Sequence, residues 1–155
     1  MKKVPGLIFF LIVIISIAYN TSNVCSAQTQ DVSEIQKLLQ SGFENGRTGK
    51  LDAAINDFNK VISLDKKNAS AYAGLGNSYA QKGNPDKAIE YYNKAISLNS
   101  KNPFTYYSLG SLYSSLNRKD DALKMLKILK DLNKNLADNL ERQMQKPNIP
   151  AKPGK

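Results

Sequence analysis

Apolar residues recur along the middle of the chain at steps of three and four, and the pattern returns every 34 residues. Three glycines, Gly42, Gly76 and Gly110, occupy the same place in successive units. The other positions that match at this spacing hold Ala54, Ala88 and Ala122; Ile55, Ile89 and Leu123; Phe58, Tyr92 and Leu126; and Leu64, Leu98 and Leu132. Steps of three and four place residues on one face of a helix. Units of fixed length are typical of stacked-repeat proteins. We therefore predict an all-α fold, an α-solenoid.

The turn residues divide each unit into two helices. Gly49 and Gly83 align with Asn117 where the first helix should end, and glycine and asparagine most readily adopt the left-handed backbone conformation found there. Asn84-Pro85 and Asn102-Pro103 each offer a capping side chain followed by proline at the first helical position. The sequence thus predicts three helical hairpins, over residues 35–68, 69–102 and 103–134.

Small residues on both helices predict how each hairpin closes. We expect Gly76 on the first helix to face Ala88 on the second, so that the two backbones approach closely. A larger residue at either position should separate the helices, at a cost of about 1–3 kcal/mol.

The two ends of the repeat differ from its middle. The first unit has Ser41 and Asn45 where later units have leucine and tyrosine, as expected of an end repeat that packs against no earlier one. After the third unit, an apolar stripe predicts a capping helix over residues 135–146. Its members are Leu136, Leu140 and Met144. Residues 147–155 hold three of the six prolines and predict a disordered or polyproline-like tail.

The first residues are typical of a targeting segment. Lys2 and Lys3 precede the apolar run 7–18, which is shorter than the ~20 residues that a membrane-spanning helix needs. We predict a signal peptide over residues 1–27, cleaved after Ala27, then a flexible lead-in over residues 28–34. The protein would be exported, either periplasmic or secreted in a bacterial-type cell. Two alternatives remain open: an uncleaved inner-membrane anchor through residues 4–19, and lipidation of Cys25.

Composition excludes several kinds of chemistry. The chain has no His and a single Cys, so it lacks the imidazole of Ser-His-Asp and Cys-His catalysis and the ligands of common zinc sites. We expect no enzymatic activity, no cofactor and no metal. The net charge of +9 comes from dispersed lysines and indicates a soluble surface, with weak attraction to anionic surfaces as the alternative. No nucleic-acid partner is expected, because no binding motif accompanies the charge.

The second unit fits a known repeat most closely. It carries Leu75, Gly76, Tyr79, Gly83, Ala88, Tyr92 and Ala95 at the characteristic places. In these residues the chain resembles the tetratricopeptide repeat family over about residues 35–134. The resemblance implies a concave groove, lined by the first helices, in which a protein or peptide partner lies.

Carried over position by position, the resemblance implies a specific groove lining. The residues it assigns are Leu39, Phe43, Arg47, Ala73, Asn77, Gln81, Phe104, Tyr107 and Ser111. Exposed aromatic residues are candidate anchors, and Asn77 would hydrogen-bond a ligand's backbone. The alternative is that Phe43 and Phe104 pack between adjacent hairpins. Some family members clamp a partner's terminal carboxylate. The corresponding residues here, Leu39, Phe43, Gly74, Phe104 and Ser108, supply no set of donors for it.

The function expected from the sequence is that of an exported scaffold. It would bind a protein or peptide in its groove and support assembly of an envelope complex. The alternatives are a membrane-anchored structural subunit and a weak binder of anionic surfaces. A homo-oligomer is also possible, because an exposed end of the first unit could stack on another copy.

Overall fold

A computed structural model describes residues 32–145, which are helical and contain no strand. The chain divides into two compact units, residues 1–37 and 38–155, and the hairpins lie in the second. The predicted signal peptide, the anchor alternative and the tail 147–155 lie outside the described residues. Residues 32–34, assigned above to a flexible lead-in, are helical instead. Within the described range, no helix combines the length and apolarity needed to cross a membrane.

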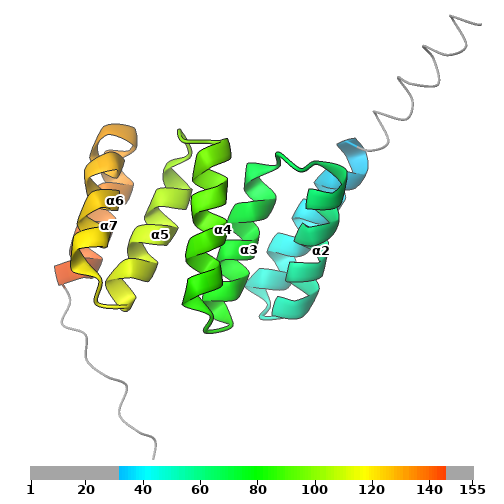
Figure 1. Cartoon of the computed structure of the whole chain (residues 1–155), viewed down its shortest axis with the longest axis horizontal. Helices are drawn as coiled ribbons and strands as arrows, with labels where there is room; N and C mark the ends of the chain where they lie inside the picture. The colour runs from blue at the N-terminus through cyan, green and yellow to red at the C-terminus, as the bar shows by residue number, and fades with distance from the viewer. Residues whose placement is uncertain (1–31, 146–155) are drawn as a thin grey trace, which may run out of the picture. The chain divides into compact units, whose positions relative to one another are not determined.

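Residues 38–145 contain the predicted succession of hairpins (Figure 1). A helix runs through residues 38–47 and is followed by α2, Leu51–Leu64. The second hairpin consists of α3, Ala69–Gln81, and α4, Pro85–Leu98; the third consists of α5, Pro103–Ser115, and α6, Lys119–Leu132. The last described helix is α7, Lys134–Gln145.

The helix ends follow the local rules that predicted them. The side chain of Asn84 accepts a hydrogen bond from the backbone N–H of Lys87, and Asn102 accepts one from that of Phe104. Gly49, Gly83 and Asn117 have φ values of 78°, 75° and 57°. The left-handed conformation predicted at all three turns is confirmed.

Gly42 and Gly76 of the first helices lie against aromatic rings of the second helices. A β-carbon added at Gly76 would lie 2.6 Å from Tyr92 Cδ1, and one at Gly42 would lie 2.8 Å from Phe58 Cε1. The nearest neighbour of Gly76 is therefore the ring of Tyr92 and not the methyl group of Ala88, although Ala88 is fully buried. The small residue makes room for an aromatic ring, which explains why glycine stands there.

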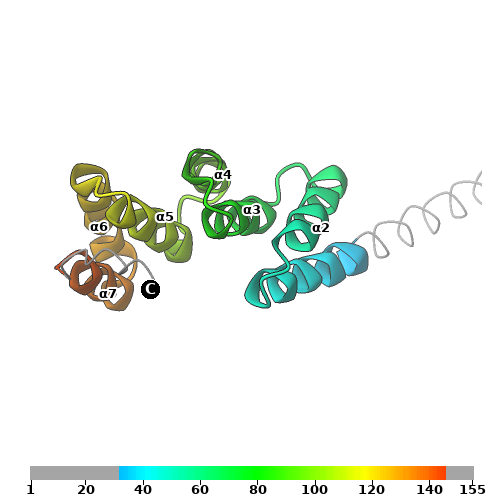
Figure 2. The same ribbon diagram turned by 90° about the horizontal axis from the view of Figure 1, so that it is seen from below.

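The capping helix closes the third hairpin, since α7 contacts both α5 and α6 (Figure 2). It begins at Lys134, one residue before the predicted start, because the Asn133 side chain accepts a hydrogen bond from the Leu136 backbone N–H. Leu140 is fully buried, and Leu136 and Met144 are partly buried.

A polar cluster stands at the other end of the repeat. Ser41 Oγ donates a hydrogen bond to Asp57 Oδ2 at 2.7 Å, and Asn45 Nδ2 donates to the same oxygen at 2.9 Å. The corresponding residues of the next unit, Leu75 and Tyr79, are apolar or aromatic. Side chains that satisfy one another in this way give the first hairpin a solvated end.

Candidate functional site

The predicted groove residues are distributed over three helices. Leu39, Phe43 and Arg47 lie in residues 38–47; Ala73, Asn77 and Gln81 lie on α3; and Phe104, Tyr107 and Ser111 lie on α5. In the described chain, α3 contacts both α2 and α5. The lining therefore follows neighbouring hairpins.

The two candidate anchors differ in exposure. Phe104 is 64% exposed, more than any other large apolar side chain of the described residues. Phe43 is 46% exposed, and its ring meets Phe58 edge to face with centroids 5.1 Å apart. Phe43 thus combines a packing contact with a free face, whereas Phe104 leaves most of its surface open.

Asn77 is held by a residue of the same hairpin. The hydroxyl of Tyr92 donates a hydrogen bond to Asn77 Oδ1 at 2.6 Å. Burial raises the pKa of Tyr92 to about 12, and a hydrogen bond with Ser108 opposes part of that rise. The phenol therefore remains protonated and a donor at neutral pH. The carbonyl of Asn77 is occupied, and its NH₂ group is what it offers to a ligand.

Two other polar groove residues, Arg47 and Ser111, already have partners. Arg47 donates to both carboxylate oxygens of Glu44, at 2.7 and 3.0 Å, and this contact lowers the pKa of Glu44. Ser111 Oγ donates to Gln143 Oε1 on α7 at 2.8 Å. The only charged member of the lining is thus neutralised locally, and the groove is electrically close to neutral.

Tyr107 lies against buried residues of α6 and α7, in a cluster that includes Leu129, Ala137 and Leu140. It is partly buried, as are Leu39 and Ala73, whereas Gln81 is exposed. Of the three aromatic residues assigned to the groove, Tyr107 therefore has the clearest structural role.

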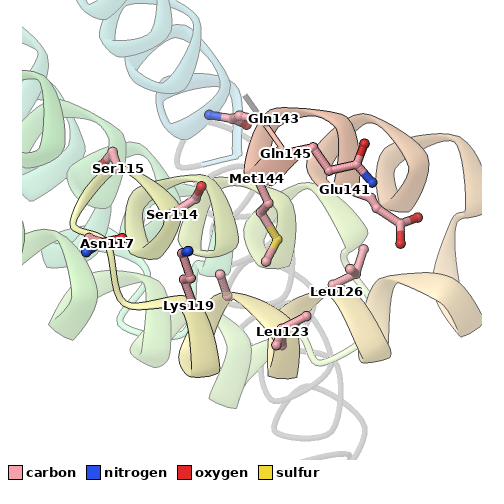
Figure 3. A pocket seen from close by; sticks show the side chains of 11 residues that line it. Ser114, Ser115, Asn117, Lys119, Leu123, Leu126, Glu141, Gln143, Met144 and Gln145 are labelled. Atoms are coloured by element: carbon pink, nitrogen blue, oxygen red, sulfur yellow. The ribbon is translucent and has the colours of Figure 1, made fainter. Parts of the chain in front are cut away.

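A pocket that the sequence analysis did not identify opens beside α7 (Figure 3). It has a volume of about 790 Å³ and lies between the last turns of α5 and α7 and the first turns of α6. Its apolar lining comes from Ala122, Leu123, Leu126 and Met144, and its polar lining from Ser114, Ser115, Asn117, Lys119, Glu141, Gln143 and Gln145.

The register of the repeat was the signal that could have revealed this pocket. Counting 34 residues on from Tyr79 leads to Tyr113, and 34 more lead to Pro147, which follows the described part of α7. The fourth unit therefore lacks the aromatic residue that the second and third units have at this place.

Several exposed lysines lie on the second helices of the hairpins. Lys60, Lys87, Lys94, Lys124 and Lys127 are all exposed and lie on α2, α4 and α6, the second helices of the hairpins. In residues 32–145, no three or more His, Cys, Asp or Glu side chains gather as metal ligands would.

Three protein-family models match the chain. They are two described as "Tetratricopeptide repeat", at residues 69–102 and 91–124, and one described as "TPR repeat", at residues 47–83. No curated protein sequence matches it.

Several solved structures share the fold. A crystal structure of MamA is 31% identical, with a TM-score of 0.60; the match covers 67% of this chain and 61% of that one. The first TPR of Spaghetti (RPAP3), bound to the HSP90 peptide SRMEEVD, is 23% identical over 72% of this chain and 90% of its own, with a TM-score of 0.66. The Yersinia enterocolitica chaperone SycD, in complex with a peptide of the translocator YopD, is 20% identical over 71% and 88%, with a TM-score of 0.65.

Proposed function

The chain is built of tetratricopeptide repeats, and from this we propose that it is a scaffold whose first helices hold a segment of a partner protein. The observation that carries the proposal is Phe104, whose ring is 64% exposed on α5. An exposed aromatic residue on a rigid helix loses little conformational freedom when a ligand covers it. The neutral lining favours a partner segment with apolar side chains and few charges.

Two further features support a peptide as the ligand. The NH₂ group of Asn77 is positioned by Tyr92 and is available to a backbone carbonyl of the partner. Two of the structures with this fold, those of RPAP3 and SycD, hold peptides. A stacked array of hairpins needs little rearrangement to receive such a segment.

Affinity capture from cells with the full chain as bait tests the proposal. Phe104→Ala should weaken the captured complex about tenfold or more, as expected for an anchor residue. Lys94→Ala, a change of an exposed residue on α4, is the matched control and should leave binding unchanged. Equal capture by wild type and Phe104→Ala would show that the groove is the wrong surface.

We propose in addition that the scaffold works outside the cytoplasm, where it supports assembly of an envelope complex. The support is the sequence of residues 1–27, with its positive start, its short apolar run and a small residue at Ala27. Sequencing the N-terminus of the purified protein tests this step. A start at Gln28 agrees with export and cleavage, whereas a start at Met1 favours the membrane-anchored alternative.

Binding to an anionic surface is the second candidate, because exposed lysines gather on the second helices. Salt distinguishes the two functions. Lysine-mediated binding should weaken steeply as salt is added, whereas binding to an apolar groove should change little.

A further inference from the structure

The helix α7 occupies the place of the first helix of an incomplete fourth unit. At a spacing of 34 residues, Leu140 corresponds to Tyr106 of the third unit and Met144 corresponds to Gly110. Leu140 and Met144 both lie on α7. Leu140 is fully buried against the third hairpin, as a residue of a following unit should be. The described part of the helix ends at Gln145, and the place that Tyr113 holds in the third unit falls on Pro147, which has no aromatic ring.

Without that aromatic ring, apolar surface stays uncovered at this place. In the second unit, Ile89 packs against a core cluster that contains Tyr113. Leu123 holds the same place in the third unit and is 52% exposed. Figure 3 shows Met144 extending from α7 toward α6, the helix that carries Leu123 and Leu126, at the pocket described above. This pocket is the space that the completed fourth unit would fill.

We propose that this chain's own C-terminal segment, Pro147–Pro150, binds in the pocket and places Ile149 against Leu123 and Met144. These residues lie outside the described range, and they follow directly from Gln145, whose side chain lines the pocket. Four residues beyond Gln145 reach roughly 13 Å when extended. Covalent continuity also gives the segment a high local concentration at the pocket.

The composition of the segment suits this place. Ile149 is the one large aliphatic side chain of residues 146–155, and prolines on both sides reduce the conformational freedom that binding removes. The ten residues also contain three lysines and no acidic residue. Asp120 is exposed at the start of α6, and Glu141 lies on the pocket wall. Lys119 also lines the pocket, and Lys130 lies 3.8 Å from Glu141, so the apolar contact of Ile149 and not charge favours this occupant.

The first hairpin of a second copy of the chain would be a poorer occupant of the pocket than the chain's own C-terminal segment. Head-to-tail stacking would place the cluster of Ser41, Asn45 and Asp57 over Leu123. That arrangement would take these polar side chains out of water against the apolar part of the pocket wall. The chain's own segment incurs no such cost.

The contact would also affect the groove. Ser114 and Ser115 line the pocket and lie in the last turn of α5, the helix that carries Phe104. A segment bound there covers this end of α5, so a partner that extends so far has to displace it. The tail is then an internal competitor at one end of the binding surface.

NMR of the full chain with labelled methyl groups tests the contact. We expect nuclear Overhauser effects from the Ile149 methyls to those of Leu123 and Met144, unchanged on tenfold dilution. Ile149→Ser should abolish them and shift the Leu123 resonances to the positions seen in a chain that ends at Gln145. Ala151→Ser, the matched control in the same segment, should preserve them.

Three results would overturn the proposal. The first is the absence of these effects in the wild type. The second is identical Leu123 shifts in the wild type and in the chain that ends at Gln145. The third is effects that fade on dilution, since these would assign the pocket to a second copy.

Discussion

The ring of Phe58 on α2 lies directly against the backbone of Gly74 on α3. A β-carbon at Gly74 would stand 2.5 Å from Phe58 Cε1, closer than carbon atoms approach without displacement. Phe58 also fills the space beside Gly42 of its own hairpin. One ring therefore joins the first hairpin to the second, and the absence of two side chains makes the contact possible.

Gly74→Ala should consequently destabilise the fold by about 1–3 kcal/mol, because the added methyl group overlaps a fully buried ring. Urea unfolding followed by circular dichroism measures the change. Gly46→Ala is the control: no atom lies within 4 Å of its added β-carbon, and alanine raises helix propensity, so stability should stay equal or rise by up to about 1 kcal/mol. Equal effects of the two substitutions would contradict the packing described here.

The buried hydroxyl of Tyr92 predicts a loss of stability at high pH. Burial raises its pKa in the folded protein to about 12, above the value of about 10 expected in the unfolded chain. Between these values the unfolded chain releases the proton first, so the free energy of unfolding falls as the pH rises from 10 to 12. The expected loss is on the order of 2 kcal/mol.

Unfolding measurements at pH 9, 10, 11 and 12 test the titration of Tyr92. In Tyr92→Phe this component should be absent, although the variant should be less stable by about 1 kcal/mol at neutral pH because it loses the hydrogen bond to Asn77. A parallel decline in the variant and the wild type would assign the effect to other tyrosines.

Phe43 and Phe104, two aromatic residues of the groove, should contribute differently to the stability of the fold. Phe43→Ala loses the edge-to-face contact with Phe58 and should cost about 1–2 kcal/mol. Phe104→Ala removes a largely exposed ring and should change stability by less than about 0.5 kcal/mol. Thermal unfolding of both variants measures these two losses of stability. A large loss for Phe104→Ala would make it a packing residue and remove it as an anchor.

The polar end of the first hairpin should control self-association. Replacing Ser41 by leucine and Asn45 by tyrosine gives this end the residues of the second unit, Leu75 and Tyr79. We expect the double variant to associate in a concentration-dependent manner in sedimentation velocity runs, because it places large apolar side chains where the wild type has a solvated polar cluster. Replacing both residues by alanine removes the hydrogen bonds to Asp57 without adding large apolar groups, and this control should remain in the wild-type state of association.

Local signals account for what the sequence predicted well. The repeat period, the asparagine caps and the left-handed turn residues each act over a few positions, and the structure confirms them at Asn84, Asn102 and Asn117. The partner of Gly76 was not predictable in this way. Gly76 and Ala88 are both small, but which side chain fills the space between helices depends on their relative rotation, and the structure places Tyr92 there.

The candidate site was less predictable than the fold. Position in the repeat assigned residues to the groove but could not give their exposure, which separates Phe104 from the packed Tyr107. The pocket at α7 depends on where the fourth unit stops. That feature follows from Pro147 only once the structure shows that α7 continues the register.

Site-specific photocrosslinking in cells tests the central claim, partner binding by the groove, most directly. A photoreactive phenylalanine analogue at position 104, on α5, should crosslink to a discrete partner, and the same analogue at position 94, on α4, should not. Both positions are exposed, so accessibility alone predicts equal yields. A partner captured from position 94 but not from position 104 would contradict the account.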